Sequence, residues 1–132
     1  MFKRCIRSEI TVPYGHAVPM DRQLFERALE NIFGNALRYT DEGDDIIIRV
    51  TDGDRAILVS VADTGHGIAE EQRSHIFDLF YRGTASRREE GFGIGLSVVK
   101  QVIDSHGWTI AVDSEPGAGT VFTISIPIAT EI

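Results

Sequence analysis

The stretch ENIFGNALRYT, residues 30–40, ends a longer segment in which apolar and polar residues alternate with the period of a helix. Asp21 is placed to cap that helix, which we expect to begin just after Pro19 and Met20. Two apolar rows spaced i, i+4 predict a broad face packed on a core. These rows contain Leu24, Phe25, Ala28, Leu29, Ile32, Phe33, Ala36 and Leu37. Two amides, Asn31 and Asn35, interrupt this pattern and must find partners.

On a helical wheel Asn31 and Asn35 lie about 40° apart at one margin of the apolar arc, and Arg38 follows about 60° further round. For one asparagine in isolation, a surface amide is the ordinary explanation. The alternative is that this margin overhangs a pocket. There, amide oxygens ligate a hard cation such as Mg²⁺ while Arg38 neutralises phosphate charge.

Length and composition favour one folded domain over residues 1–132. The net charge of −7, without a run of basic residues, disfavours direct nucleic-acid binding. Cys5 is the only cysteine, which excludes an internal disulfide and favours a reducing cytosol. Apolar runs fall far short of the roughly 20 residues that a membrane span needs, so we expect no direct membrane contact.

Hydrophobic periodicity predicts the remaining elements. We expect strands near 5–12, 46–50, 56–62, 108–112 and 120–126, and further helices near 70–76 and 96–105. A turn centred on Asp52 and Gly53 is expected to join the second and third strands. Hairpins without regular βαβ alternation favour an α+β fold. We predict a two-layer α/β sandwich, with a mixed, mostly antiparallel sheet of about five strands covered on one face by three helices.

Three glycine-containing stretches are candidates for ligand contact. In VADTGHGI, residues 61–68, Asp63 ends a strand, where its carboxylate can accept a hydrogen bond from the amino group of a planar heterocycle. GFGIGL, residues 91–96, opens a helix whose free N–H groups suit a phosphate. GAGTVF, residues 117–122, places Thr120 at the mouth of the last strand. Each stretch alone is more often a plain turn than a site.

Taken in order, ENIFGNALRYT, DTGHGI, FDLFYRG, GFGIGL and GAGTVF resemble the N, G1, F, G2 and G3 boxes of the ATP-binding catalytic domain of sensor histidine kinases. This family belongs to the gyrase, heat-shock chaperone, histidine kinase and mismatch-repair superfamily with the Bergerat ATP fold. The resemblance implies Mg²⁺–ATP binding and transfer of the γ-phosphoryl group to a histidine on a separate dimerisation and phosphoacceptor domain, then to a response regulator. It also implies a cytoplasmic domain whose parent can be anchored in the bacterial inner membrane.

Carried over residue by residue, the resemblance implies that Asn35 ligates Mg²⁺ beside Asn31, and that Asp63 binds the adenine amino group. The catalytic set would be Asn31, Asn35, Arg38 and Arg82. The other implied nucleotide contacts are Tyr39, Gly65, Gly67, Ile68, Phe80, Gly91, Gly93, Gly95, Leu96 and Thr120. Residues 82–90 would form an ATP lid, from which Arg82 and either Arg87 or Arg88 meet the γ-phosphate.

Some positions depart from the family pattern. Leu79 stands where the F box often has proline, and His66 takes a G1 position usually filled by a smaller or stiffer residue, so we expect altered loop details. In hydrolytic relatives a glutamate four positions before the metal-binding asparagine activates water. Here that position is Asn31, whose amide cannot take up a proton, so we expect ATP to be held without efficient hydrolysis.

The phosphoacceptor is expected to lie outside residues 1–132. None of His16, His66, His75 and His106 lies in the His-Glu-x-x-Arg-Thr-Pro context of family acceptors. The alternative function is a stand-alone anti-sigma-type serine kinase of the same fold. Those kinases usually keep the water-activating glutamate, which this chain lacks.

Overall fold

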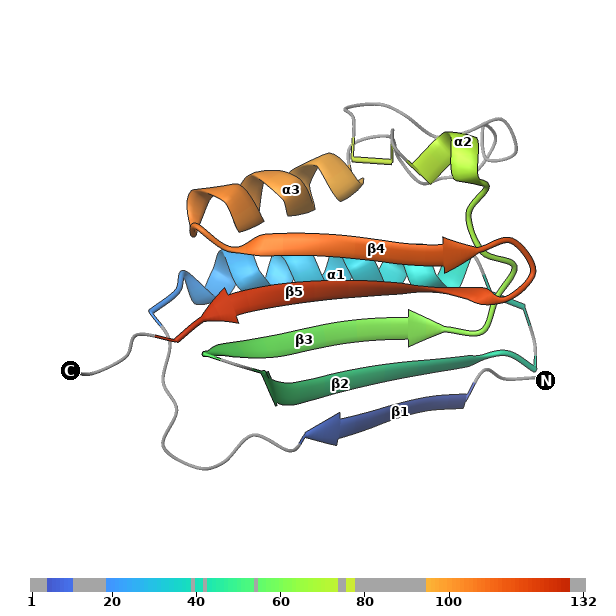
Figure 1. Cartoon of the computed structure of the whole chain (residues 1–132), viewed down its shortest axis with the longest axis horizontal. Helices are drawn as coiled ribbons and strands as arrows, with labels where there is room; N and C mark the ends of the chain where they lie inside the picture. The colour runs from blue at the N-terminus through green and yellow to red at the C-terminus, as the bar shows by residue number, and fades with distance from the viewer. Residues whose placement is uncertain are drawn as a thin grey trace.

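The structure, a computed structural model, describes residues 5–10, 19–38, 40–41, 43–53, 55–73, 76–77 and 95–128. One five-stranded sheet has the order β1-β2-β3-β5-β4. β1 pairs with β2 in parallel, and the other neighbours are antiparallel. The elements are β1 (Cys5–Ile10), α1 (Arg22–Arg38), β2 (Asp45–Gly53), β3 (Ala56–Asp63), α2 (Glu70–Arg73), α3 (Gly95–Ser105), β4 (Thr109–Glu115) and β5 (Gly119–Pro127). The predicted α+β sandwich is confirmed (Figure 1).

Helix α1 begins as its sequence predicts. The Asp21 side chain accepts a hydrogen bond from Leu24 N at 3.1 Å, and Asp21 O accepts one from Phe25 N at 2.9 Å. This is an N-cap, which satisfies N–H groups that the first helical turn leaves unpaired. At the other end, Thr40 Oγ1 donates to Ala36 O at 2.9 Å. The buried face consists of Ala28, Ile32, Asn35 and Ala36, whereas Leu24 at the predicted stripe's start is 36% exposed.

The hairpin between β2 and β3 turns later than predicted. Strand pairing continues through Asp52↔Ile57 to Gly53↔Ala56, so both Asp52 and Gly53 belong to β2. The positive φ angle that the tight turn requires is found at Arg55, with a value of 61°. The Asp-Gly turn prediction is therefore wrong. Cross-strand pairing of the long apolar strands fixed the register and moved the turn beyond the Asp-Gly pair.

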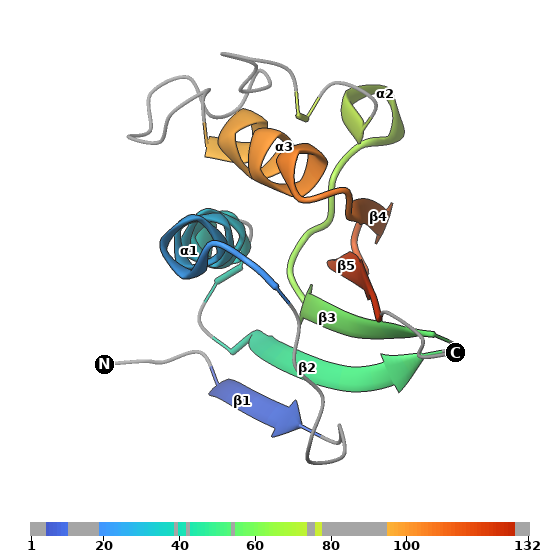
Figure 2. The ribbon, with the colours of Figure 1, turned by 90° about the vertical axis from the view of Figure 1, so that its left-hand side faces the viewer.

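The core lies between one sheet face and helices α1 and α3, which pack side by side on that face (Figure 2). Alternate residues of β3 and β5 point into it, which explains why every second residue of these strands is buried. The buried apolar side chains from the two strands are Ile57, Val59, Val61, Phe122, Ile124 and Ile126. Within the described part of the chain, no helix has both the length and the hydropathy to span a bilayer.

At one end of the domain α1 is tied to the end of α3. His106 Nε2 accepts a hydrogen bond from Asp21 N at 3.0 Å, and His106 Nδ1 lies 2.9 Å from Val102 O. The His106 ring also stacks on Trp108, with ring centroids 4.3 Å apart. The other end brings together the last turn of α1, the end of β3 and the first turn of α3 (Figure 1). Most described residues of the predicted site lie in or next to these segments, whereas Asn31 lies near the middle of α1.

The short helix α2 spans Glu70–Arg73 and lies near that same end, in contact with β4. Ile76, the end of the helix predicted near residues 70–76, is not helical, and residues 74 and 75 lie outside the described residues. Ile76 is 6% exposed and belongs to the core, and Phe77 packs against Phe122 with ring centroids 6.3 Å apart. The aromatic residue at the start of the F box therefore has a packing role, which is the ordinary function of such a residue.

Candidate nucleotide-binding site

Asp63 is the buried carboxylate of the site, 7% exposed at the end of β3. Its Oδ1 accepts a hydrogen bond from Gly65 N at 2.9 Å. Burial raises the pKa of the Asp63 carboxyl above its ordinary value, and the backbone groups of Gly65 and Thr120 oppose that rise. Nearby charges have smaller and opposite effects on this pKa, because His66 lowers it and Asp44 raises it. An aspartate buried at this position is suited to accept a hydrogen bond from a ligand.

Two glycines let the loops around Asp63 approach each other closely. Gly67 has a φ of 78°, and a Cβ there would overlap the carbonyl oxygen of Glu115. Gly119 has a φ of 105°, and a Cβ there would overlap the carbonyl oxygen of Asp63. Only glycine combines such a backbone with such close contact. Gly117 N donates to His66 O at 2.7 Å, which joins the two loops directly.

A buried hydroxyl pair links the same loops, and sequence reasoning found only one of its members. Thr120, 1% exposed, pairs across the sheet with Asp63. Its Oγ1 lies 2.8 Å from Oγ of Ser114, a residue outside every predicted motif. Strand alternation in the sequence could have indicated that Ser114 is buried. Ile110, Val112 and Ser114 are alternate residues of β4, and they occupy the positions that face the helices. A serine that continues an apolar row indicates a buried hydroxyl with a specific partner.

Asn35 and Asn31 differ sharply in their surroundings. Asn35 is 6% exposed, and its buried Nδ2 has no hydrogen-bond partner. Asn31 is half-buried, and its Nδ2 donates to Arg27 O at 2.9 Å. A buried donor without a partner costs about 1–3 kcal/mol, and a bound ligand that accepts its hydrogen bond would remove this cost. The amide of Asn35 therefore fits a ligand or a metal-bound group, whereas that of Asn31 is satisfied within the helix.

Arg38 lies in the last turn of α1 and is half-buried. Gly95 begins α3, and Leu96, in its first turn, packs against the core. Ile68 is 1% exposed, and its N–H donates to Ser114 Oγ at 2.8 Å. Some predicted site residues lie outside the described residues, and their roles stay predictions. These are Tyr39, Phe80, Arg82, Gly91, Gly93 and the lid 82–90 with Arg87 and Arg88.

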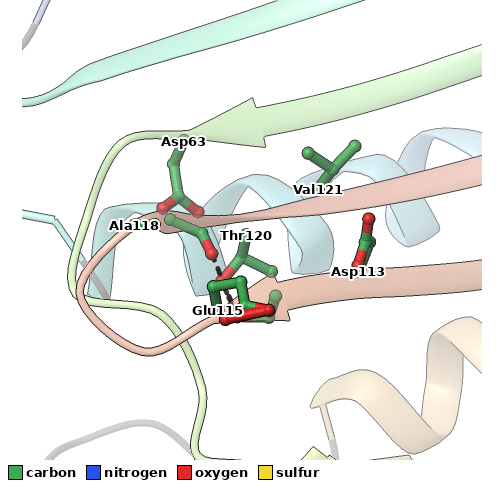
Figure 3. Close-up of a pocket in the computed structure, with 8 residues that line it drawn as sticks. Asp63, Asp113, Glu115, Ala118, Thr120 and Val121 are labelled. Carbon is green, nitrogen blue, oxygen red and sulfur yellow. Dashed lines mark hydrogen bonds between the residues drawn. The ribbon is translucent and has the colours of Figure 1, made fainter.

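A cavity of about 160 Å³ opens at the end of the sheet (Figure 3). Asp63 directs its carboxylate toward the β4–β5 turn, near Thr120 and Ala118. The lining residues are Asp63, Asp113, Ser114, Glu115, Ala118, Gly119, Thr120 and Val121. Small-molecule sites usually measure about 300–1,000 Å³, so this cavity is only part of a nucleotide site. A larger cavity of about 330 Å³ between α1 and the sheet is apolar and contains no predicted site residue.

Comparison with known proteins decides the family. The model for histidine kinase-, DNA gyrase B- and HSP90-like ATPases matches residues 20–130. The chain belongs to this family. The sensor protein IrlS of Burkholderia pseudomallei is 39% identical over 112 residues, which cover 83% of this chain and 24% of that protein. The sensor protein SrrB of Staphylococcus aureus is 41% identical over 110 residues, covering 82% of this chain and 18% of that protein.

Solved histidine kinase structures share the fold. The mycobacterial sensor histidine kinase MprB superposes with a TM-score of 0.80 at 30% identity, covering 96% of this chain and 86% of that one. Full-length ShkA in complex with AMPPNP gives a TM-score of 0.81 at 29% identity, covering 96% of this chain and 26% of that one. The predicted membership among ATP-binding domains of the histidine kinase type is confirmed. The chain spans a quarter or less of the length of the sensor proteins IrlS and SrrB.

Proposed function

We propose that this domain binds Mg²⁺–ATP and donates the γ-phosphoryl group to a histidine on a separate dimerisation and phosphoacceptor domain, in two-component signalling. The observation that carries the proposal is Asn35. Its Nδ2 is buried without a hydrogen-bond partner, and it lies on the helix whose last turn shares one end of the fold with the Asp63 carboxylate. Family membership supports ATP as the ligand. The structural likeness to full-length ShkA, which was solved in complex with the ATP analogue AMPPNP, supports it too.

Each described site residue has a role in this proposal. Asp63 accepts a hydrogen bond from the adenine amino group, with Thr120 beside it and Gly65 holding the carboxylate in place. Asn35 supplies an amide oxygen to Mg²⁺, which usually takes only one or two protein ligands together with substrate phosphates. When bound, Mg²⁺ neutralises phosphate charge. Arg38, in the last turn of the same helix, adds a fixed positive charge for the phosphates.

Asn31 explains why the nucleotide would be kept for a protein acceptor. Its Nδ2 donates to Arg27 O, and an amide has no basic site with which to take a proton from water. Phosphoryl transfer depends mainly on positioning and charge neutralisation, so an acceptor histidine can supply the nucleophile. The γ-phosphoryl group then passes to that histidine instead of to water.

The rest of the pathway is part of the same proposal. The relatives IrlS and SrrB, in which the matched region covers only 24% and 18% of the protein, support an acceptor domain elsewhere in the parent protein. A response regulator would then receive the phosphoryl group. The domain would act in the cytoplasm, where ATP is available.

Binding is tested by titrating the chain with AMPPNP in the presence and absence of Mg²⁺ in a calorimeter. Asp63→Asn removes a charged hydrogen-bond acceptor worth about 1.5–3 kcal/mol, so affinity should fall about 10–150-fold. Asn35→Ala should remove most of the Mg²⁺ dependence. Asp104→Asn is the matched control, because Asp104 is an exposed aspartate paired with Lys100 on α3. Unchanged affinity in both site variants would refute the proposed site.

Transfer is tested with labelled ATP and an isolated acceptor domain of the parent protein. The proposal predicts a labelled product that is lost in acid and survives alkali, as phosphohistidine does. An acid-stable product on a serine substrate would instead support the anti-sigma-type kinase. Transfer that persists undiminished in Asp63→Asn would show that the described site is not the one used.

A further inference from the structure

Ser114 is a buried polar residue that none of the family boxes contains. It lies on β4, is 4% exposed, and faces the helix layer. Its hydroxyl contacts two segments that are separated in sequence. Ile68 N donates to Ser114 Oγ at 2.8 Å, Gly119 O accepts from it at 3.0 Å, and Thr120 Oγ1 lies 2.8 Å away. Ser114 therefore connects the loop after Asp63 with the start of β5.

The proton positions in this group can be worked out from its contacts. A serine hydroxyl has one proton, and a carbonyl oxygen can only accept. The contact with Gly119 O therefore uses the Ser114 proton. The 2.8 Å contact with Thr120 then requires the Thr120 hydroxyl to be the donor. Because its proton points at Ser114, Thr120 Oγ1 presents only lone pairs to its other neighbours.

Thr120 stands beside the carboxylate that defines the site. Asp63 and Thr120 are directly paired on adjacent strands, with side chains on the same buried face, and both line the cavity (Figure 3). We infer that Ser114 is a positioning residue for base selection: it orients the Thr120 hydroxyl so that Thr120 and Asp63 together present acceptors. This inference rests on the proposed function. Two acceptors suit the amino group at position 6 of adenine and repel the oxygen at that position in hypoxanthine or guanine.

The test compares affinities for ADP and IDP, which differ at position 6 and have no γ-phosphate to lose. The wild-type chain should prefer ADP. Ser114→Ala frees the Thr120 hydroxyl to rotate and donate to the oxygen of IDP, so the preference for ADP should fall about tenfold. Thr120→Val should reduce the preference similarly. Ser114→Ala added to Thr120→Val should change it by less than about twofold, because Ser114 acts through Thr120.

Two variants separate orientation from simple stability. Ser114→Thr keeps a hydroxyl and should retain the preference for ADP. Ser105→Ala is the matched control, since Ser105 Oγ bonds Val102 O at the opposite end of α3. If Ser114→Ala does not fold, Ser114→Cys takes its place, because the thiol fills the same space as a weaker donor and should also reduce the preference.

The inference is overturned if Ser114→Ala weakens ADP and IDP binding equally. It is overturned as well if Ser114→Ala has its full effect in the Thr120→Val background. If the wild-type chain binds ADP normally in either case, the proposed function stands and only the role of Ser114 fails. If the wild-type chain binds no nucleotide, both fail together.

Discussion

Removal of the Asn35 side chain should stabilise the free domain while it removes most of the Mg²⁺ dependence of nucleotide binding. In most buried positions, truncation of a side chain to alanine is destabilising. Asn35 is an exception because its buried Nδ2 has no partner, so the folded free domain bears the desolvation cost of that amide. Asn35→Ala removes this cost. It also removes the oxygen that is proposed to ligate Mg²⁺.

The magnitude follows from the contrast with Asn31. Both residues lie within α1, so replacing either by alanine gains a similar helix propensity, about 0.5 kcal/mol. Asn31→Ala loses the hydrogen bond to Arg27 O, worth about 1 kcal/mol, and should change stability little. Asn35→Ala removes an unpaired amide that costs about 1–3 kcal/mol. With an unfolding entropy of about 2.1 cal/mol/K per residue over 132 residues, this amide cost alone corresponds to about 4–11 °C in Tm.

The assay is thermal unfolding without nucleotide, followed by circular dichroism, together with calorimetric titration of Mg²⁺–AMPPNP. Asn35→Ala should melt above both the wild type and Asn31→Ala, and should bind the nucleotide with little dependence on Mg²⁺. A Tm of Asn35→Ala several degrees below that of Asn31→Ala would refute the reasoning. It would mean that the Asn35 amide is already satisfied in the free domain.

Three further outcomes are expected. Gly119→Ala should lower the free energy of unfolding in urea by at least about 2 kcal/mol, because the added Cβ overlaps Asp63 O. Gly43→Ala is the control, since Gly43 has a φ of 93° but open space around it, and it should cost clearly less stability. Equal losses in the two variants would contradict the packing argument. Burial raises the pKa of Asp63, so the stability that this group contributes is present at low pH and lost as pH rises through the raised value. The Tm of Asp63→Asn minus the Tm of the wild type, both measured without nucleotide, should therefore increase from about pH 4 to pH 7. A difference in Tm that does not change with pH would contradict this reasoning. Asn31→Glu should raise the rate of ATP hydrolysis at least about tenfold in a phosphate-release assay. An unchanged rate would show that the missing general base at position 31 does not limit hydrolysis.

Local patterns in the sequence were sufficient for most of the fold. The Asp21 cap and the i, i+4 rows of α1 depend only on near neighbours in the chain, and both were predicted. The strands were also placed, because alternation of apolar residues is local as well. The β2–β3 turn was misplaced, since Asp52-Gly53 has the right local chemistry but strand register overrode it. Register depends on pairing across the whole sheet.

The candidate site, like the fold, was predicted in part from local sequence and in part only from the tertiary structure. Asp63, Asn35 and Thr120 were proposed because they lie in recognisable stretches. The family resemblance assigned Mg²⁺ to Asn35, but the local sequence did not show that the two asparagines of α1 differ in burial. Only the packing of α1 shows that Asn31 is satisfied by Arg27 O and that Asn35 is buried without a partner. Desolvation depends on what surrounds a group in space, and no local pattern records it.

By itself, the amino-acid sequence determined the family, the order of the elements and the absence of a water-activating carboxylate at position 31. Those properties depend on residue identity and short spacing. Only the tertiary structure decided that Ser114 meets Ile68, 46 positions away, and that Asp63 pairs with Thr120. Hydrogen bonds of 2.8–3.0 Å at the Ser114 hydroxyl require the loop that contains Ile68 to lie within a fraction of a residue spacing of the distant β4–β5 hairpin, and the packed sheet provides that alignment.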